Sequence, residues 1–586
     1  MVDLDDFLKK GPLQANRWLL DVLQHDGERA DLYRQLRARR QLLRFTSTAD
    51  AGSPGQPVYR QEVVLLALPE HIERALTEAD KFSNSPYRAL GSGTFMLGLD
   101  GPPHTAQRTQ AGPLLAAISP WLPALNKIAW NIAAVLPLKQ RGFDAAGLAE
   151  QVALRFAGLL FGLPPQDHVL LETAMRLGYQ QLTYQIVGRH FEPQPLLDIR
   201  AKGAGGAFAA RMTELLGEYL RGDVPQDILD LQTRLPGFVP LLQALAREPG
   251  GATLAELTVL AGGLIAGMIG NVQASVAIAL DCLLESPGLA GLFALANGAE
   301  AGNPAWTELQ ARVLQALALN PPAALLPRKV RNKLELDLGD GQTATLAAGT
   351  ELLLAIGSAT AARLDKAPAG GADALIYGGD GGHGHACLGA FIGTPLVVMI
   401  VRNILRLPGL TRAIDPRTGL ALRLEKTWGF RCDKLALEYA QDIAMVQSPL
   451  AIFMPVRPPV AVNAELLKTI IAVGAPRIEL KLAESRQVHF AWFLLLDNDS
   501  QLALFTTFDG DFDTYLKHFA LEVGTLFDKL FECLADPPPM PVAQYPDEFV
   551  AKVRQYHRTP VGSYFFSAYP QARVSDIASA LARVPK

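Results

Sequence analysis

Cys387 is the residue whose surroundings point most directly to chemistry. It lies in a glycine-rich stretch, residues 377–390, and a long apolar segment, residues 391–401, follows it. Glycine lets the backbone turn so that the sulfur projects, and backbone N–H groups can then donate hydrogen bonds to it. A single cysteine presented in this way can bind a metal as a thiolate. The alternative interpretation is a buried cysteine that merely follows a glycine-rich loop.

His104 and Arg108 form a second candidate pair. They lie four residues apart in a stretch that begins with Asp100, so on a helix they share one face. His383 and His385, just before Cys387, also suggest a metal site. That signal is weak, because two ligands on a glycine-rich loop have no third partner in the sequence nearby.

In this order and spacing, the motifs resemble those of the cytochrome P450 family. Residues 377–390 resemble the family's haem-ligand loop, and residues 100–108 resemble the start of its helix C. Further short stretches match the family in order and spacing, namely residues 319–322, 326–328, 348–350, 357–359, 405–410 and 428–431. No single stretch is specific, so the resemblance rests on their common order from Asp100 to Arg431.

The resemblance implies a mainly α-helical cytochrome P450 fold with a minor β part, and haem b (iron protoporphyrin IX) as the cofactor. It implies that Cys387 is the axial ligand of the iron. A thiolate in that position pushes electron density onto the iron and favours cleavage of an O–O bond. By the same resemblance, the haem propionates contact His104, Arg108, Arg328 and His385.

The chain departs from the family at residues 269–271, on the segment that matches the long distal helix. Oxygen-activating members carry an acidic residue followed by Thr there, but this chain has Asn271. An amide cannot relay protons as that pair does, but it can donate a hydrogen bond to a peroxide oxygen and accept one. In this respect the chain resembles peroxide-rearranging members such as allene oxide synthases and prostacyclin synthase. The alternative is that Asn271 simply bonds a neighbouring carbonyl group.

The neighbours of Asn271 lead to further expectations. Gly267 and Gly270 should open space above the iron. On a helix, Ser275 shares the face of Asn271, whereas Gln273 points away from it.

Two more departures concern the haem side of the fold. The family's Glu-x-x-Arg pair is replaced by Gln-Ala-Leu-Ala at residues 315–318. Both partners of a buried salt bridge are therefore missing, a loss that can be nearly neutral for stability. Asp380 and His383 take the places of the usual Phe and Gly in the haem loop. The predicted haem site is thus a divergent one.

The leading functional hypothesis is a haem-thiolate enzyme that rearranges, cleaves or uses an organic, lipid-type hydroperoxide without a reductase. It would be a hydroperoxide isomerase, a lyase or a peroxygenase with Asn271 as a catalytic residue, and its substrate would be small and apolar or lipid-like. One alternative is a P450 monooxygenase, which needs separate redox partners because the chain has no recognisable reductase motif. Another is a non-catalytic haem-binding protein whose active site has decayed.

The length of the chain, 586 residues, favours two domains. Residues 1–445 are predicted to form the haem-thiolate domain, and residues 446–586 a C-terminal ferredoxin-like α+β domain with additional helices. The second prediction rests on strand-like segments at 450–456, 489–496 and 502–508 and helical segments at 465–473 and 513–534. We expect this domain to lack a redox cofactor and to support dimer formation or docking of a partner.

Composition excludes other classes of protein. The net charge of -4 does not favour a nucleic-acid partner. The four cysteines are widely spaced, which fits a reducing cytoplasm rather than a disulfide framework, and the acidic N-terminus has no signal-peptide pattern. Residues 257–280 are apolar and long enough to cross a bilayer, but their glycines and amides favour a buried central helix. We therefore predict a cytoplasmic protein without a transmembrane segment.

Overall fold

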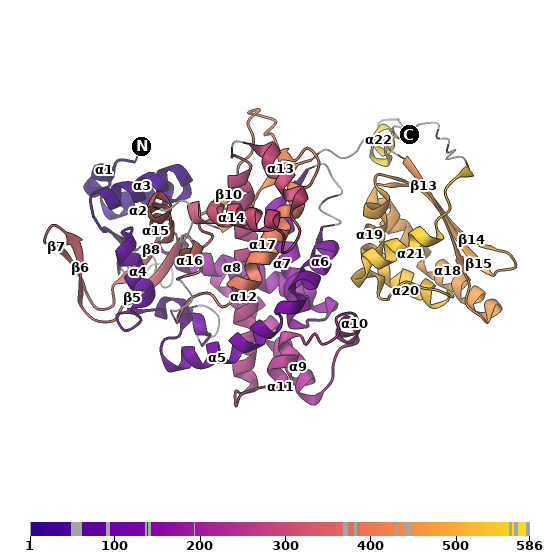
Figure 1. Ribbon diagram of the computed structural model, residues 1–586, viewed down its shortest axis with the longest axis horizontal. Helices are drawn as coiled ribbons and strands as arrows, with labels where there is room; N and C mark the ends of the chain where they lie inside the picture. The colour runs from indigo at the N-terminus through magenta and orange to yellow at the C-terminus, as the bar shows by residue number, and fades with distance from the viewer. Residues whose placement is uncertain are drawn as a thin grey trace. The chain divides into compact units, whose positions relative to one another are not determined.

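The chain divides into two compact units in the computed structural model (Figure 1). The first consists of Met1–Asn126 and Asp144–Glu438, and the second of Lys127–Phe143 and Tyr439–Lys586. The structure describes residues 2–47, 61–89, 94–134, 138, 142–192, 194–286, 288–366, 373–379, 384–428, 431–439, 447–561, 565, 567 and 572–581.

The first unit is mainly helical, as the sequence predicts. Its helices are α1 (Leu4–Lys9), α2 (Pro12–Gln24), α3 (Asp26–Ala38), α4 (Pro69–Thr77), α5 (Pro102–Ala117), α7 (Ala145–Phe161), α8 (His168–Ile186), α9 (Pro195–Arg221), α10 (Gln226–Arg234), α11 (Leu241–Arg247), α12 (Leu254–Leu283), α13 (Leu289–Gly298), α14 (Pro304–Leu319), α15 (Ile356–Lys366), α16 (Asp373–Ile376) and α17 (Ala390–Leu405). Helix α6 (Leu122–Ala133) contributes residues to both units.

Helix α12 is the central element of the first unit (Figure 1). It begins at a capping box, in which the side chains of Thr253 and Glu256 each accept a hydrogen bond from the other residue's backbone N–H. The helix contacts α7, α8, α9, α14 and α17. It is long and apolar enough to cross a membrane, and 61% of its apolar 18-residue window is buried inside the fold. Because a helix that is apolar on all sides needs apolar surroundings, this packing agrees with the predicted central helix.

A five-stranded sheet makes up most of the minor β part. Its strand order is β1 (Leu43–Ser47), β2 (Gln61–Leu66), β8 (Glu351–Ala355), β5 (Leu325–Val330) and β3 (Phe82–Ser83). Strands β2 and β8 are parallel and the other neighbours are antiparallel. The smaller sheets contain β6 (Leu334–Gly339), β7 (Gln342–Leu346), β9 (Thr411–Arg412), β10 (Glu425–Thr427), β11 (Arg431–Lys434) and β12 (Ala436–Glu438), together with β4 (Gly142–Asp144), which, like α6, has residues in both units. This arrangement confirms the fold class predicted for the first unit.

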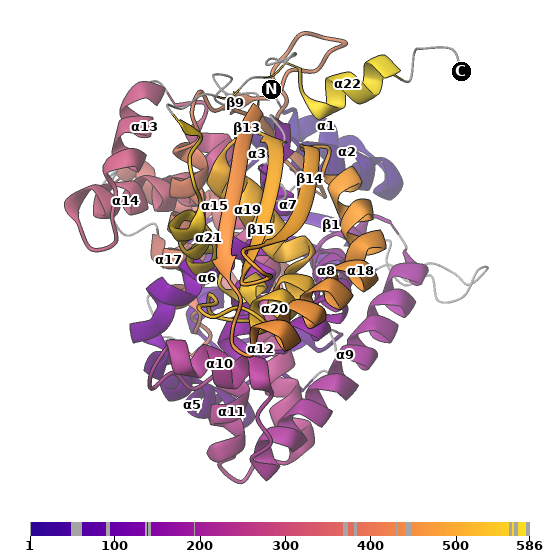
Figure 2. The same cartoon turned by 90° about the vertical axis from the view of Figure 1, so that its right-hand side faces the viewer.

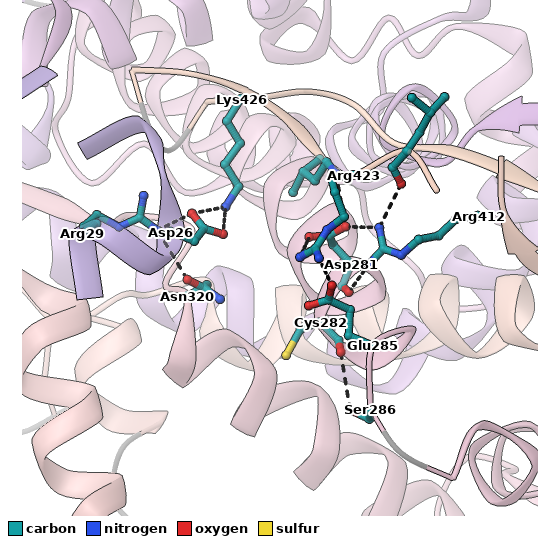
Figure 3. Close-up of polar contacts among 12 residues, drawn as sticks. Asp26, Arg29, Asp281, Cys282, Glu285, Ser286, Asn320, Arg412, Arg423 and Lys426 are labelled. Carbon is teal, nitrogen blue, oxygen red and sulfur yellow. Dashed lines mark hydrogen bonds and ion pairs between the residues drawn. The ribbon is translucent and has the colours of Figure 1, made fainter. Parts of the chain in front are cut away.

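Charged side chains from distant segments hold the end of α12 (Figure 3). The carboxylate of Asp281 accepts hydrogen bonds from the guanidinium of Arg412 and, at 3.2 Å, from the backbone N–H of Leu424. Arg412 also donates to the backbone carbonyl of Asp281, and both side chains are largely buried. Removing one partner of such a buried pair leaves an uncompensated charge, so the pair holds the segment around Arg412 to α12.

A second charged cluster lies at the end of α14 (Figure 3). The Lys426 ammonium lies 2.7 and 2.9 Å from the two carboxylate oxygens of Asp26, and Arg29 donates to the same carboxylate at 2.7 Å. Arg29 also reaches the side-chain oxygen of Asn320, which caps α14, at 3.4 Å. Burial acts to raise the pKa of Asp26, but these two cations outweigh it and hold that pKa below its ordinary value. The cluster ties α3 and β10 to the helix in which the Glu-x-x-Arg pair is missing.

The second unit contains a three-stranded antiparallel sheet with helices on one face. The strand order is β13 (Gln447–Pro455), β15 (Gln501–Asp509) and β14 (Val488–Leu496). Its helices are α18 (Val460–Ser485), α19 (Phe512–Glu522), α20 (Gly524–Glu532), α21 (Pro546–Tyr556) and α22 (Val574–Leu581). The helical segment predicted over 513–534 is two helices that meet at Val523, whose ψ of 21° leaves the helical range.

The order of strands and helices confirms an α+β domain. The sequence β13-α18-β14-β15-α19 with β15 in the middle is the arrangement of the first three strands of a ferredoxin-like fold. Among the described residues, the edge of β13 where a fourth strand would lie has only isolated antiparallel bridges, from Ile452 to His557 and, just past the strand, from Val456 to Leu534. One face of the sheet packs its side chains, including Leu450, Leu502 and Phe508, into a core with the helices.

Candidate functional site

One cavity in the first unit is lined by every residue that the sequence predicts for the site. Its volume is about 340 Å³, and its walls come from α5, α12, β5, the segment 384–389 and α17. The predicted residues that line it are His104, Arg108, Asn271, Arg328, His385 and Cys387. Residues that are about 280 positions apart in the sequence therefore meet at one site.

Cys387 lies directly before α17 and faces the cavity. Its backbone N–H donates to the Tyr377 carbonyl at 2.8 Å, and backbone N–H groups of Gly389 and Ala390 point to its sulfur. Gly378 has a φ of 80°, a left-handed conformation that a residue with a side chain rarely adopts, where the chain turns towards this loop. Cys387 is the exposed one of the four cysteines, because the cavity opens onto it.

The surroundings of Cys387 favour the neutral thiol when no cation is bound. Burial raises the pKa of the Cys387 thiol, although the two N–H groups at Gly389 and Ala390 and the guanidinium of Arg108 act in the opposite direction. A bound metal cation would reverse this balance and stabilise the thiolate. The same N–H groups would then donate hydrogen bonds to a negatively charged sulfur.

Two histidines lie against each other on another wall of the cavity. The rings of His104, on the first turn of α5, and His385 have centroids 3.9 Å apart. Burial and the nearby His104 lower the pKa of His385 to about 3, and burial also lowers the pKa of His104. Both rings are therefore neutral near pH 7 and can donate one hydrogen bond each to an anion.

Two arginines add positive charge to this wall. Arg108 donates to the carbonyl of Ala386 at 2.6 Å, and Arg328 donates to the carbonyls of Ala75 and Pro327 at 3.3 and 2.9 Å. Within the described part of the chain, neither guanidinium forms a salt bridge with a carboxylate. Arg328 is only 5% exposed. A buried cation without an anionic partner is costly, so this wall fits a ligand that brings carboxylates of its own.

Asp100 and Tyr87 support this cluster, and neither was among the predicted site residues. Asp100 accepts from the Ser83 hydroxyl at 2.5 Å and from the Arg331 guanidinium at 2.8 Å, and lies 3.8 Å from His385. The sequence contained a signal for Asp100, namely an acidic residue directly before Gly-Pro-Pro. Tyr87 interacts with Arg328 and has no comparable signal in the sequence.

Asn271 faces the cavity from α12, and one of its contacts is local. Its side-chain nitrogen donates to the Gly267 carbonyl at 2.7 Å, as the structural alternative for this residue expects. Ser275 lines the same cavity, as predicted. The side chain of Gln273 lies 3.4 Å from the carbonyl of Cys432 and is not among the lining residues, so it points away from Asn271 as expected.

Of the two glycines expected to open space on α12, only Gly267 does so. A Cβ atom at Gly267 would meet nothing within 4 Å, and this residue lines the cavity. A Cβ atom at Gly270 would lie 2.1 Å from the ring of Tyr179, so the expectation for Gly270 is wrong. The space beside Gly270 is filled by an aromatic side chain of α8.

The structure tests two further departures only in part. Asp380 and His383 lie outside the described residues, so their positions in the loop stay predictions. Residues 316–318 of α14 are buried and apolar, so the family's buried pair is absent at residues 315–318. The ion pair that this helix does carry, Glu308 with Arg312 at 2.8 Å, lies earlier on it, has a four-residue spacing and is about half exposed.

The described residues fit haem b in this cavity on two observations. A cysteine aligned by backbone N–H groups can serve as the iron ligand, and the cationic wall can receive two propionates. The remaining lining residues are mostly apolar, which suits a porphyrin and an apolar substrate. Among the described lining residues there is no Asp or Glu.

No family model matches the sequence, and no curated protein is similar enough in sequence to count as a relative. Solved structures do match. P450BioI in complex with a hexadec-9Z-enoic acid-ligated acyl carrier protein has a TM-score of 0.52 and 16% identity, covering 71% of this chain and 99% of that one. The P450 monooxygenase TamI has a TM-score of 0.52 and 19% identity, covering 75% and 99%.

A third match is the mycinamicin VIII C21 methyl hydroxylase MycCI from Micromonospora griseorubida. It has a TM-score of 0.51 and 20% identity, and the match covers 70% of this chain and 96% of that one. Proteins of this fold bind haem b. Together with the helices and strands of the first unit, these matches show that the chain has the fold of the cytochrome P450 superfamily, as its motifs predicted.

Proposed function

We propose that the chain binds haem b in this cavity and acts on an organic hydroperoxide without a reductase. The observation that carries the proposal is the absence of any Asp or Glu from the described residues that line the cavity. Activation of dioxygen needs protons and electrons delivered in sequence, and a carboxylate is the usual side chain for the protons. The two oxygens of a hydroperoxide are already at the peroxide oxidation level. Its O–O bond can therefore be cleaved without that delivery of electrons and protons.

In this proposal the chain's own residues hold the cofactor. The thiolate of Cys387 would bind the iron, and the propionates would lie against Arg108, Arg328 and the two histidines His104 and His385. A bound haem with a thiolate ligand would supply cleavage of the O–O bond. The protein supplies orientation and excludes water.

Asn271 would orient the hydroperoxide. One of its amide hydrogens is engaged by the Gly267 carbonyl, which fixes the side chain on α12. An amide has a second N–H and two acceptor positions on its oxygen, so it can still donate to one peroxide oxygen and accept from the other. The open position at Gly267 leaves room beside it.

The elements around the thiolate favour chemistry without an electron donor. On α5 and over residues 384–405, the charged residues are Arg108, which lines the cavity, and Arg402, which is 9% exposed and pairs with Glu300. Phe391, at the start of α17, is 41% exposed. Weak electron-transfer complexes are steered by complementary charge, and these elements offer little exposed charge for such steering.

The remaining wall indicates the class of substrate. Phe95, Leu264, Met268 and Leu326 line the cavity together with other apolar side chains. A small apolar or lipid-like hydroperoxide would bury its chain against this wall. The spacing of the cysteines leads us to infer a cytoplasmic location.

A monooxygenase with separate redox partners is the second candidate. The hydroxyl of Ser275 lines the cavity on the face of Asn271, and a hydroxyl with ordered water can pass protons. Two of the similar structures are named as a monooxygenase and a hydroxylase. A haem-binding protein without catalysis is a third candidate. The family's acidic residue and Thr are missing at residues 269–271, and its Glu-x-x-Arg pair is missing at residues 315–318.

The test uses purified ferric protein, a fatty-acid hydroperoxide and no NAD(P)H or reductase. We expect the hydroperoxide to be consumed with repeated turnover and converted to a defined product. Reductase-dependent hydroxylation of an unoxidised substrate, with no reaction toward hydroperoxides, would instead support the monooxygenase. Haem binding without either reaction would leave the non-catalytic protein.

A further inference from the structure

In the described part of the second unit, the core helices pack on one face of the sheet and leave the opposite face uncovered, except at one end, where α22 begins and the Val574 N–H donates to Asp509. The register of the three strands places alternate side chains on the face opposite the core. We call these residues the outer sheet face: Gln447, Pro449, Ala451, Phe453 and Pro455 on β13, Phe490, Trp492, Leu494 and Leu496 on β14, and Gln501, Ala503, Phe505, Thr507 and Asp509 on β15. In Figure 2 the three strands lie side by side, with α18 along β14.

The outer sheet face is mostly apolar, and its β14 side is open to solvent. Phe490, Trp492 and Leu494 are 57%, 48% and 43% exposed. The rings of Trp492 and Phe505 stack with centroids 5.3 Å apart, and Phe505 meets Phe453 edge to face at 5.6 Å. A row of aromatic rings therefore crosses all three strands. Exposed apolar surfaces of this kind mark binding sites in soluble proteins.

The scarcity of charge on this face limits the kinds of partner that can bind it. Its one charged residue, Asp509, is 7% exposed and already lies 2.8 Å from a ring nitrogen of His489 and accepts a hydrogen bond from the Val574 backbone N–H. A partner with a charged surface would lose hydration there without gaining ion pairs, whereas an identical apolar face has few charges to desolvate. The turn between β14 and β15 carries Asp497 and Asp499, which would oppose an anionic membrane surface.

The size of the face is enough for a weak dimer. Strands of nine residues, as here, are about 30 Å long, and three of them span about 14 Å. With the relief of the side chains, this gives roughly 500 Å² per copy, or about 1,000 Å² for two copies, near the lower limit of a specific interface. Two sheets packed face to face bury such surfaces in a layer about 10 Å thick.

We propose that the outer sheet face binds the same face of a second copy of the chain, so that the two sheets form a sandwich around a two-fold axis. Phe490, Trp492 and Phe505 are the main contacts. The inference is independent of the reaction catalysed in the first unit. It assigns a role in assembly to the domain that has no recognisable cofactor motif.

Sedimentation velocity of the full chain from about 1 to 100 μM tests the proposal. We expect a monomer–dimer equilibrium in this range. The double variant Phe490→Glu with Trp492→Glu should weaken the dimer at least about 100-fold, because buried aromatic contacts dominate such interfaces. Val169→Glu is the matched control: Val169 is 72% exposed on α8, outside the outer sheet face, and the variant should dimerise like the original protein.

Two results would overturn the proposal. One is a full chain that stays monomeric at the highest concentration. A monomer that binds phosphatidylcholine vesicles through this face would count as the same result. The other is a dimer that the double variant leaves unchanged. Circular dichroism checks that the variants fold, and if the double variant does not, the milder Trp492→Ala must weaken the dimer in the same direction.

Discussion

Two side chains decide what chemistry the cavity can support. Cys387 offers a sulfur that is protonated while only protein surrounds it, since burial raises the pKa of its thiol, and a bound cation would stabilise its thiolate. Asn271 offers hydrogen bonds without a proton that it can lose at neutral pH. In the proposed reaction, a bound haem would supply the bond cleavage and the amide would orient the substrate, in a cavity whose described lining has no carboxylate.

Replacing Cys387 by Ser should remove the thiolate signature from the carbon monoxide difference spectrum of the reduced protein. A hydroxyl is a far weaker ligand for the iron than a thiolate. Cys282→Ser is the matched control, because Cys282 is part-buried at the end of α12 and outside the lining of the cavity. A Cys387→Ser spectrum identical to that of the original protein would eliminate the assignment.

Replacing Asn271 by Leu should slow hydroperoxide turnover about 10²-fold or change the product ratio, as the loss of one positioned hydrogen-bond donor does in other enzymes. Steady-state rates and product analysis on the ferric protein measure this. Gln273→Leu, two residues along the helix and pointing elsewhere, should keep the rate within a few-fold. Equal losses in both variants would point to a general disturbance of α12 instead.

Helix α12 positions the amide, and its glycines determine how closely the neighbouring elements approach. Gly270 lies against Tyr179 of α8, and Gly263 lies against Phe95, where a Cβ atom would come within 2.3 Å of the ring. Gly267, one turn from each, opens to the cavity. The same residue type thus serves packing at two positions and the site at one.

Gly270→Ala and Gly267→Ala should therefore have opposite effects on stability. A methyl group at Gly270 would collide with several ring atoms of Tyr179, and such overpacking typically costs about 1–3 kcal/mol. At Gly267 the methyl group has space, and the better helix propensity of Ala is worth up to about 1 kcal/mol. Chemical denaturation of both variants measures the difference. Equal stabilities would show that Tyr179 moves aside without cost.

The sequence predicts those features that depend on local pattern. The apolar run of α12, the described glycines before Cys387 (Gly378, Gly379 and Gly384) and the four-residue spacing of His104 and Arg108 are local, and the structure places them as expected. The filling of the space at Gly270 depends on Tyr179, 91 residues earlier in the chain, so no local pattern contains it. The break at Val523 was missed because the apolar spacing continues through it from α19 into α20.

The candidate site and the C-terminal domain are formed by different parts of the chain. All the described residues that line the cavity fall between Asn84 and Val397, inside the first unit. The second unit has its own core, which includes Leu450, Phe508 and Phe549. A domain with its own core can fold alone, so haem binding should not depend on the second unit.

A chain truncated after Gln447 should still bind haem, with the absorption spectrum of the full protein. Its haem content per polypeptide, measured after purification, checks this. Loss of haem from a truncated chain that is folded by circular dichroism would contradict the separation. A flavin or iron–sulfur centre found in the full chain would contradict the expectation that the second unit has no redox cofactor.

The origin of the product oxygen tests the central claim most directly. One reaction mixture would contain the protein, an unlabelled fatty-acid hydroperoxide, the unoxidised fatty acid, a reductase system with NADPH, and ¹⁸O₂. Because the described lining of the cavity offers an amide and no carboxylate, we expect products that derive from the hydroperoxide, carry only unlabelled oxygen, and form at the same rate when the reductase is omitted. Products that carry ¹⁸O from dioxygen and disappear without the reductase would contradict the account.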